Sequence, residues 1–322
     1  MQILLTGGAG YIGSVIMELL LENNETVIVL DDLSEGNPQA IPNEVEFYEG
    51  DFSDIRILES IIKNHSIDVV IHLAAFASVP DSVLKPLDYY ENNVVKTIHL
   101  LKMMQQFGVN KMIFSSTAAV YGVSKSEVIT EESDTRPVNP YGWSKLMIER
   151  VLQDLNVTNG FKSMSFRYFC AAGATERHGE SRKKGETHLI PLVVDSATNQ
   201  NDILKVFGND FPTRDGTGVR DYIHVLDIAQ AHIFALHAIE ECQSEIFNLG
   251  SGKGYSVLEV IKTARKVLNL DIAYKIVDRR MGDPPCLIAS SRKARSKLGW
   301  EPKLGLDEMI KSTFHWRNGP LY

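Results

Sequence analysis

The stretch Thr6-Gly7-Gly8-Ala9-Gly10-Tyr11-Ile12-Gly13 decides the fold, because it lies between a predicted strand at 3–6 and a predicted helix at 12–22. Its glycines permit a tight turn and let the backbone approach a pyrophosphate, which then sits at the helix N-terminus. In a strand–turn–helix context the pattern predicts a dinucleotide site rather than an ordinary turn. The candidate cofactor-binding residues of this turn are Gly7, Gly10, Tyr11, Ile12 and Gly13.

Short apolar runs alternate with helical patterns through the first half of the chain. The predicted strands are 3–6, 26–31, 45–48, 68–73, 111–116 and 163–169. The predicted helices are 12–22, 55–64, 87–106 and 140–155. Strands that alternate with helices predict βαβ units, so we expect an α/β fold with a doubly wound, Rossmann-like parallel sheet.

The pattern loosens after residue 173. Polar, glycine-containing segments at 175–187 and 209–218 predict surface loops, and 256–268 predicts a further helix. We therefore expect an NAD-binding domain at 1–173 and a smaller substrate-binding lobe at 174–322. Some late segments are expected to pack back on the first domain.

Composition narrows the function classes. The chain has 322 residues, of which 44% are hydrophobic, enough for a large core. A net charge of −8 argues against a nucleic-acid binder, which usually carries a basic excess. No apolar run is long enough for a transmembrane helix, and the first residues lack the pattern of a signal peptide. Cys170, Cys242 and Cys286 are odd in number and widely spaced, which fits a reducing cytoplasm and predicts no metal site.

Asp31 indicates which dinucleotide is bound. It ends the second predicted strand, 18 residues after Gly13. A carboxylate there accepts hydrogen bonds from a ribose 2′-hydroxyl and repels a 2′-phosphate, and no arginine follows in the run Asp31-Asp32-Leu33-Ser34. The sequence therefore favours NAD over NADP.

Residues after the third and fourth strands are further cofactor candidates. Asp51 and Phe52 can reach the adenine edge, although Asp51 could equally cap the strand end. Leu73 and Ala74 follow His72, and small side chains there let the cofactor pass closely. We interpret His72 itself as a structural histidine.

A tyrosine and a lysine at the start of the 140–155 helix are candidate catalytic groups. Tyr141 and Lys145 are four residues apart and so share one helix face. A free tyrosine has a pKa near ~10 and is a poor base at neutral pH, but a nearby ammonium stabilises its phenolate. Asn139 is a good N-cap and Pro140 suits the first helical position. The spacing alone could be accidental, so the interpretation rests on the other motifs, including Thr117.

Together these motifs resemble the extended short-chain dehydrogenase/reductases. Two later blocks, 208–225 and 85–94, are similar to those of the UDP-sugar 4-epimerases within that family, and the resemblance runs from the first strand to Trp316. It implies NAD-dependent 4-epimerisation of a UDP-hexose, UDP-glucose or UDP-galactose, through a transient 4-keto sugar.

The resemblance also implies roles for single residues. Tyr141 would take the proton of the sugar 4-hydroxyl, and Thr117 would bond the reacting oxygen. Lys145 would support the phenolate and contact the nicotinamide ribose, and Asn92 would help to hold the NAD. The implied substrate-binding residues are Thr117, Tyr141, Cys170, Leu189, Arg220, Arg280, Asp283 and Leu287. The two arginines would bind the diphosphate and Asp283, in Gly282-Asp283-Pro284, the nucleoside ribose; as isolated residues the arginines would be read as surface ion pairs.

Two positions depart from the family pattern. Cys170 stands where many members have asparagine, and a thiol is a weaker donor than an amide. Leu287 stands where hexose-restricted members have tyrosine. The smaller leucine side chain leaves room for a 2-N-acetyl group on the sugar. The alternatives left open are therefore a UDP-N-acetylhexosamine, a UDP-pentose or a UDP-uronate as main substrate. The basic residues of the 175–187 loop could meet an acidic sugar, though a solvated loop is the simpler interpretation: Arg177, Arg182, Lys183 and Lys184.

Two other function classes remain as alternatives. A nucleotide-sugar 4,6-dehydratase would carry Asp-Glu directly after the threonine, whereas Thr117 is followed by Ala118 and Ala119. A non-catalytic NAD-binding protein would be free to lose Tyr141, Lys145 or Thr117, and this chain has all of them. The resemblance further implies a homodimer formed through the helices predicted at 87–106 and 140–155.

Overall fold

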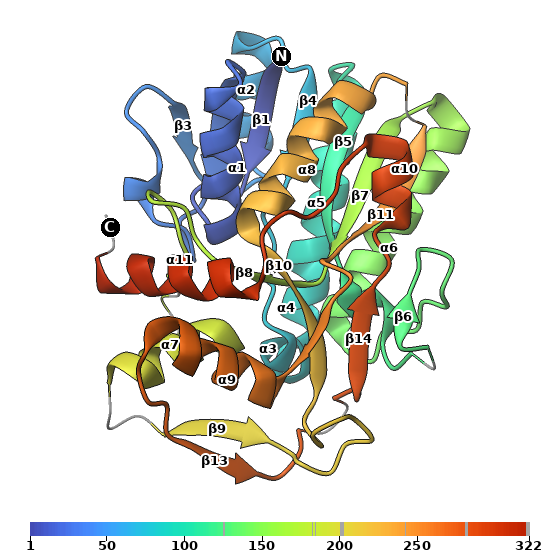
Figure 1. The fold of residues 1–322 in the computed structure, drawn as a ribbon. Coiled ribbons are helices and arrows are strands. Elements are labelled where there is room, and N and C mark those ends of the chain that lie inside the picture. Colours follow the sequence, from blue (N-terminus) through green and yellow to red (C-terminus); the bar gives the residue numbers. More distant parts are fainter. Residues whose placement is uncertain are drawn as a thin grey trace.

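The computed structural model describes residues 1–124, 126–181, 183, 185–199, 203–241, 243–280 and 283–319. Within these residues, seven parallel strands form the central sheet in the order β11-β7-β5-β4-β1-β2-β3 (Figure 1). The strands are β1 (Gln2–Thr6), β2 (Thr26–Asp31), β3 (Glu46–Glu49), β4 (Val69–His72), β5 (Lys111–Thr117), β7 (Lys162–Tyr168) and β11 (Ser244–Leu249). The predicted α/β class with a doubly wound parallel sheet is confirmed.

Helices cover both faces of this sheet. Successive strand residues point to opposite faces, so Ile3 and Leu5 pack with α1 (Tyr11–Glu22) and α8 (Val225–Ala238), whereas Leu4 packs on the other side. That side is covered by α2 (Ile55–Asn64), α5 (Lys96–Gln106) and α6 (Pro140–Asn159). Strands buried on both faces explain the continuous apolar runs in the sequence.

A second group of elements lies below the central sheet (Figure 1). In it β10 (Val219–His224) pairs in parallel with β14 (Cys286–Ala289) and β8 (Cys170–Ala172), and antiparallel with β12 (Gly254–Ser256). The remaining elements of this part are β6 (Val128–Ile129), which pairs with β14, the pair β9 (Leu204–Phe207) and β13 (Tyr274–Val277), and the helices α7 (Leu189–Thr198), α9 (Val257–Leu268) and α11 (Leu306–Asn318). A separate apolar cluster joins the three helices.

Besides α8, two late elements belong to the first sheet. Strand β11 forms its edge beside β7, and α10 (Arg292–Leu298) packs on β11 and α8. Among the described residues no helix has the length and apolar character needed to cross a membrane.

The single helix predicted at 87–106 is wrong in its middle. The chain forms α3 (Val79–Leu84), then α4 (Pro86–Tyr90), a wide π-type segment at Glu91–Val95 and finally α5. The wide turn buries two neighbouring amides, Asn92 and Asn93, which an ordinary helix would point 100° apart. π-type turns of this kind occur frequently at functional sites.

The 175–187 segment is also only partly the surface loop that was predicted. Its middle, His178–Glu180, is buried against α11, where the Trp316 Nε1 donates to the carbonyl oxygen of Glu180 at 3.3 Å. A Cβ on Gly179 would lie 2.4 Å from the Trp316 ring, so the ring needs a glycine there. The 209–218 loop agrees with the prediction, since β9 ends before it and β10 follows it.

Candidate active site

The glycine turn leaves room only for backbone. Gly7 has a φ of +76°, and a Cβ there would lie 2.6 Å from the Ala74 amide nitrogen. A Cβ on Gly13 would lie 2.1 Å from the Gly7 carbonyl oxygen. Gly10 is the N-cap of α1 and gives it no side-chain cap, so the first-turn N–H groups face outward without one. The turn therefore fits a pyrophosphate, which such a helix end attracts.

Asp31 is held ready at the end of β2. Its carboxylate is buried and accepts hydrogen bonds from the backbone amides of Ala9 (3.0 Å) and Leu33 (2.9 Å). Burial raises the pKa of Asp31, and the two amide hydrogen bonds act against that rise. Each oxygen keeps a second lone pair, so the group can still accept ribose hydroxyls.

The other cofactor candidates line the same end of the sheet. The amides of Leu73 and Ala74 both donate to the Thr6 carbonyl oxygen, which brings the loop after β4 beside the glycine turn. The Tyr11 hydroxyl donates to the Gly173 carbonyl oxygen at 2.5 Å, and Ile12 follows it as the second residue of α1. Parallel strands end together here, as they do in dinucleotide-binding folds.

Asp51 and Phe52 have partners within the protein. Asp51 accepts from Ser53 and from the Lys96 ammonium, and these bonds hold its pKa below the usual range although burial acts in the opposite direction. Phe52 packs edge-on against His72 at 4.9 Å between ring centroids. These bonds tie Asp51 to Ser53, just before α2, and to Lys96 of α5, and its reach to the adenine edge stays a prediction.

His72 is built into the core. Its Nδ1 lies 2.7 Å from the Thr6 Oγ1 and its Nε2 lies 3.0 Å from the Thr97 Oγ1. Burial, together with the charge of Lys145, lowers the pKa of His72 to about 3. The ring is therefore neutral and structural, as the sequence analysis interpreted it.

Helix α6 positions the candidate catalytic pair. Asn139 caps it by accepting from the Gly142 amide at 2.8 Å, which places Tyr141 in the first turn as predicted. Lys145 is one turn further on and is 3% exposed. Its Nζ donates to the Ser115 carbonyl oxygen at 2.7 Å and lies 4.8 Å from the centre of the Phe114 ring. The helix thus brings the ammonium to the end of β5.

Thr117 ends β5, two residues after Ser115. It is buried, and its Oγ1 accepts from the Ala119 amide at 3.1 Å. A hydroxyl that accepts one hydrogen bond can still donate its own proton to a substrate oxygen. Since alternate strand residues share a face, Thr117 lies on the same side of β5 as Ser115.

Burial makes Lys145 an unusual lysine. Desolvation lowers the pKa of Lys145 from 10.5 to about 7, and the Glu149 carboxylate one helical turn further on acts against that fall. Shifted pKa values of this kind are common where proton transfer takes place.

Sequence reasoning missed the residue that joins the two halves of this site. Asn93, in the π-type segment, accepts from the Phe76 amide at 2.9 Å and donates to the Phe76 carbonyl oxygen at 2.9 Å and to the Ser144 hydroxyl at 3.1 Å. The predicted Asn92 donates to Asn93 at 3.1 Å. Asn93 therefore ties the loop after β4 to α6 beside Lys145, and the paired amides of the sequence were the only signal for it.

The candidate substrate residues gather around β10. Cys170 on β8 pairs in register with Tyr222, and Leu287 on β14 pairs with Arg220. The Arg220 guanidinium donates to the Pro284 carbonyl oxygen at 2.8 Å and lies 3.5 Å from the Asp283 carboxylate. Burial raises the pKa of Cys170 to about 11, against the pull of Arg220, so its thiol stays protonated.

Two further candidates lie in the same lobe. Leu189 is the first residue of α7 and is half-buried. The Arg280 guanidinium stacks on Phe207 at 3.9 Å from the ring centre, and Phe207 had not been predicted. The structure brings Cys170, Arg220, Asp283 and Leu287 together, whereas the contact of Arg280 is with Phe207 on β9. Cys242, Gly282, Arg182 and Lys184 lie outside the described residues.

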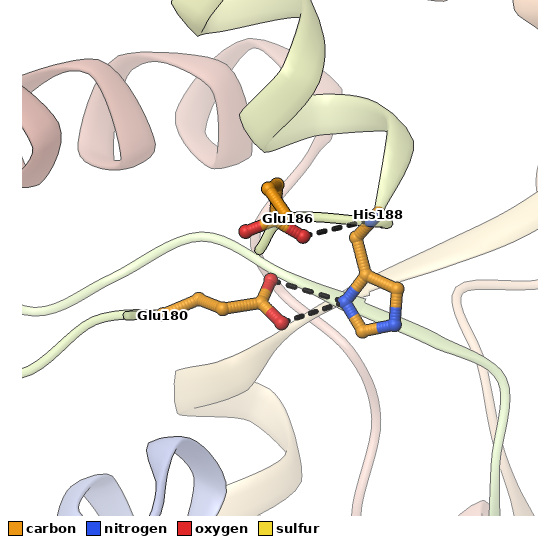
Figure 2. A group of neighbouring side chains, drawn as sticks. All are labelled: Glu180, Glu186 and His188. Carbon is orange, nitrogen blue, oxygen red and sulfur yellow. Dashed lines mark hydrogen bonds and ion pairs between the residues drawn. The ribbon is translucent and has the colours of Figure 1, made fainter. Parts of the chain in front are cut away.

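Glu180, Glu186 and His188 form a cluster in the second lobe (Figure 2). The His188 Nδ1 lies 2.8 Å from one oxygen of Glu180 and 3.0 Å from the other, and the His188 amide donates to Glu186 at 2.8 Å. These bonds between the three residues account for their arrangement, and we propose no metal site here.

Fold and site together define a dinucleotide-binding enzyme of the short-chain dehydrogenase/reductase class. Residues 3–250 match the NAD-dependent epimerase/dehydratase family. The chain belongs to that family.

Relatives match over the full length. A UDP-glucose 4-epimerase of Halalkalibacterium halodurans is 48% identical over 98% of this chain and 95% of its own. The crystal structure of UDP-glucose 4-epimerase from Bifidobacterium longum, in complex with NAD⁺ and UDP, is 39% identical with a TM-score of 0.93, covering 99% of this chain and 98% of its own. The UDP-Glc/GlcNAc 4-epimerase of Campylobacter jejuni is 40% identical with a TM-score of 0.88, covering 98% and 99% of the two chains.

The buried lysine makes stability depend on pH. Between pH 7 and 10.5 the unfolded chain holds the Lys145 proton and the folded chain does not, so the free energy of unfolding rises with pH. Relative to a Lys145→Met variant, the cofactor-free protein should gain ~2 kcal/mol between pH 7 and pH 9. Urea unfolding of both proteins at the two pH values measures this. Parallel stability curves for the two proteins would show that Lys145 titrates normally.

Proposed function

We propose that this chain is an NAD-dependent UDP-glucose 4-epimerase, which interconverts UDP-glucose and UDP-galactose through a transient 4-keto sugar. The observation that carries the proposal is the full-length match to proteins of that name. Lys145 is bound to the Ser115 carbonyl oxygen on β5, two residues before Thr117. This places a cation and a hydroxyl near one another, as the reaction needs.

The glycine turn and Asp31 would hold the dinucleotide. The turn offers backbone N–H groups to the pyrophosphate, and Asp31 offers a carboxylate to the adenosine ribose. The remaining contacts would come from Tyr11, Ile12, Asp51, Phe52, Leu73, Ala74, Asn92, Tyr141 and Lys145. When bound, NAD⁺ supplies the acceptor and donor of hydride at the sugar C4.

The protein's own task is to move one proton. Tyr141, as phenolate, takes the proton of the 4-hydroxyl and returns it after the sugar ring has turned over. Lys145 stabilises the phenolate, and Thr117 donates a hydrogen bond to the reacting oxygen. The reaction has no net redox change, so one bound NAD serves many turnovers.

The substrate lobe supplies the charges and the shape for the nucleotide sugar. We assign NAD binding to residues 1–173 and nucleotide-sugar binding to 174–322. Arg220 and Arg280 are the cations for the diphosphate, and a planar guanidinium suits bidentate phosphate contacts. Asp283 would accept from the nucleoside ribose, while Cys170 and Leu189 line the site.

We further propose a homodimer in the cytoplasm. Helices α3 and α4 pack on α6, and together they expose large apolar side chains: Val83, Leu84, Leu87, Trp143 and Met147. Such a patch is typical of an interaction site, and a second copy of the chain would cover it. Cys170 and Cys286 are free thiols, as in a reducing compartment.

A second substrate class is favoured by one observation. Leu287 lies opposite Arg220 in the register of β14 and β10, beside the residues that would hold the sugar diphosphate. It is smaller than a tyrosine there would be, so a 2-N-acetyl group would find space. A UDP-N-acetylhexosamine is therefore the main alternative substrate, ahead of a UDP-pentose or UDP-uronate. A 4,6-dehydratase is disfavoured because Ala118 follows Thr117.

The proposed role of the Tyr141 hydroxyl can be tested by removing that hydroxyl. Tyr141→Phe should lower kcat for UDP-galactose by about a thousandfold, the usual contribution of a positioned acid–base group. NAD binding, measured by calorimetry, should persist because the ring and helix remain. Tyr274→Phe, which removes a hydroxyl from distant β13, should leave kcat unchanged. Full activity of Tyr141→Phe would refute the assigned role.

The proposal that the space beside Leu287 admits a 2-N-acetyl group can be tested by placing a larger side chain there. Leu287→Tyr should lower turnover of UDP-N-acetylgalactosamine at least ~tenfold relative to UDP-galactose, because the added ring excludes the acetyl group. Leu287→Met, which conserves volume, should keep the wild-type ratio. Product analysis for both sugars gives the ratio. An unchanged ratio in Leu287→Tyr would show that this position does not limit the sugar pocket.

The dimer can be tested at the apolar patch. The double change Leu84→Lys and Leu87→Lys places two charges among side chains that are each 78% exposed in the single chain. The protein should then elute with the mass of one chain in size-exclusion chromatography with light scattering. Val157→Lys, at the far end of α6, is the control and should stay dimeric. A dimer that survives the double change would place the interface elsewhere.

A further inference from the structure

A buried ion pair lies under the candidate catalytic helix and has no part in the mechanism above. Glu149 on α6 is 2% exposed and Arg167 on β7 is 3% exposed. The Arg167 Nε donates to one carboxylate oxygen at 2.9 Å and its Nη2 to the other at 2.6 Å. The guanidinium is in turn fixed by the Tyr121 hydroxyl at 2.8 Å.

This pair joins three elements at the level of the reacting groups. Glu149 follows Lys145 by four residues, so both lie on one face of α6. Its carboxylate also accepts from the Ser116 hydroxyl at 2.5 Å. Ser116 stands between Ser115, which binds the Lys145 ammonium, and Thr117, and it pairs in register with Arg167. One carboxylate therefore links α6 to both β5 and β7.

Stabilisation of the fold does not explain why this ion pair is buried. Two charges removed from water lose much hydration, and apolar residues of similar volume often serve the fold equally well. A bidentate pair does, however, fix distance and direction more strictly than apolar packing. The position of Lys145 relative to Thr117 is what this geometry fixes.

We propose that Glu149 is a positioning residue for the epimerase reaction, which holds Lys145 in place and keeps its ammonium charged beside Tyr141. The proposal rests on the proposed function. Arg167 and Ser116 hold the carboxylate, and Glu149 acts on the reaction only through Lys145.

The charges around Lys145 support this role. Glu149 is the charged group that opposes the effect of burial on the pKa of Lys145. His72 on β4 is neutral, and β5 contributes only Phe114 and Ser115 to the contacts of the ammonium. Further titratable groups on the surrounding elements include Tyr141 on α6, Arg167 and Tyr168 on β7, and Tyr89 on α4.

The test replaces the Glu149 carboxylate with an uncharged amide of the same shape. In the NAD-loaded enzyme, Glu149→Gln should lower kcat for UDP-galactose at least ~tenfold with little change in KM. The alkaline limb of the kcat profile should move down by about one pH unit or more, because Lys145 loses its proton more easily. An Asp195→Asn control breaks another bidentate carboxylate–arginine pair, with Arg317, far from α6. It should lower stability without moving the profile.

A second readout is independent of activity. The folding equilibrium constant of each protein is compared with that of its Lys145→Met counterpart across pH. Where folded Lys145 has lost its proton and unfolded Lys145 has not, this ratio rises up to ~tenfold per pH unit. In Glu149→Gln the rise should begin at a lower pH than in the wild type. This result stands even if UDP-galactose proves not to be a substrate.

Two outcomes would overturn the proposal. One is a Glu149→Gln enzyme with the kcat and pH profile of the wild type. The other is an unchanged onset of the stability rise. Glu149→Gln leaves Arg167 unpaired, which can prevent folding. In that case the double variant Glu149→Gln/Arg167→Met removes both charges. Its kcat should still fall, because the carboxylate that links α6 to β5 and β7 is lost, but its pH profile should move less, because losing the Arg167 charge acts on Lys145 in the opposite direction. A double variant with the kcat of the wild type would overturn the proposal.

Discussion

The ammonium of Lys145 has to carry a charge inside the protein core, and the arrangement of the site depends on this constraint. Burial lowers the pKa of Lys145 to about 7. The Ser115 carbonyl oxygen, the Phe114 ring and the Glu149 carboxylate act in the other direction. The lysine must also stay one helical turn from Tyr141, so the capped start of α6 and its seat on β5 are part of the same requirement.

The glycine turn imposes the second constraint, which is space. Because Gly7 has no side chain, the loop after β4 can lie directly on the glycine turn, and because Gly13 has none, the turn can close on itself. Asn93 then links that loop to α6 through Phe76 and Ser144. The proposed dinucleotide and proton-transfer residues are in this way linked by hydrogen bonds, which suits a reaction that moves hydride at C4 and a proton at its hydroxyl oxygen.

The sequence predicted what depends on local pattern. The strands of the first half, the Asn139 cap of α6 and the glycine turn all follow from residues that are neighbours in the chain. What it missed depends on distant contacts. The π-type segment is fixed by Asn93 reaching Phe76 and Ser144, which are 17 and 51 residues away. The buried middle of the 175–187 segment depends on Trp316, and the two-residue strand β6 exists only because β14 lies beside it. The roles of Ser115 and Glu149 appear only when β5 and α6 are packed together.

The central claim is that one carbon of a UDP-sugar loses and regains its hydrogen inside a single closed site. The most direct measurement is to incubate the purified protein, without added NAD, with UDP-galactose carrying deuterium at C4, and to analyse the product by mass spectrometry and NMR. The account predicts UDP-glucose that keeps the deuterium at C4. Loss of the label to water, or the absence of UDP-glucose even after NAD is supplied, would contradict it.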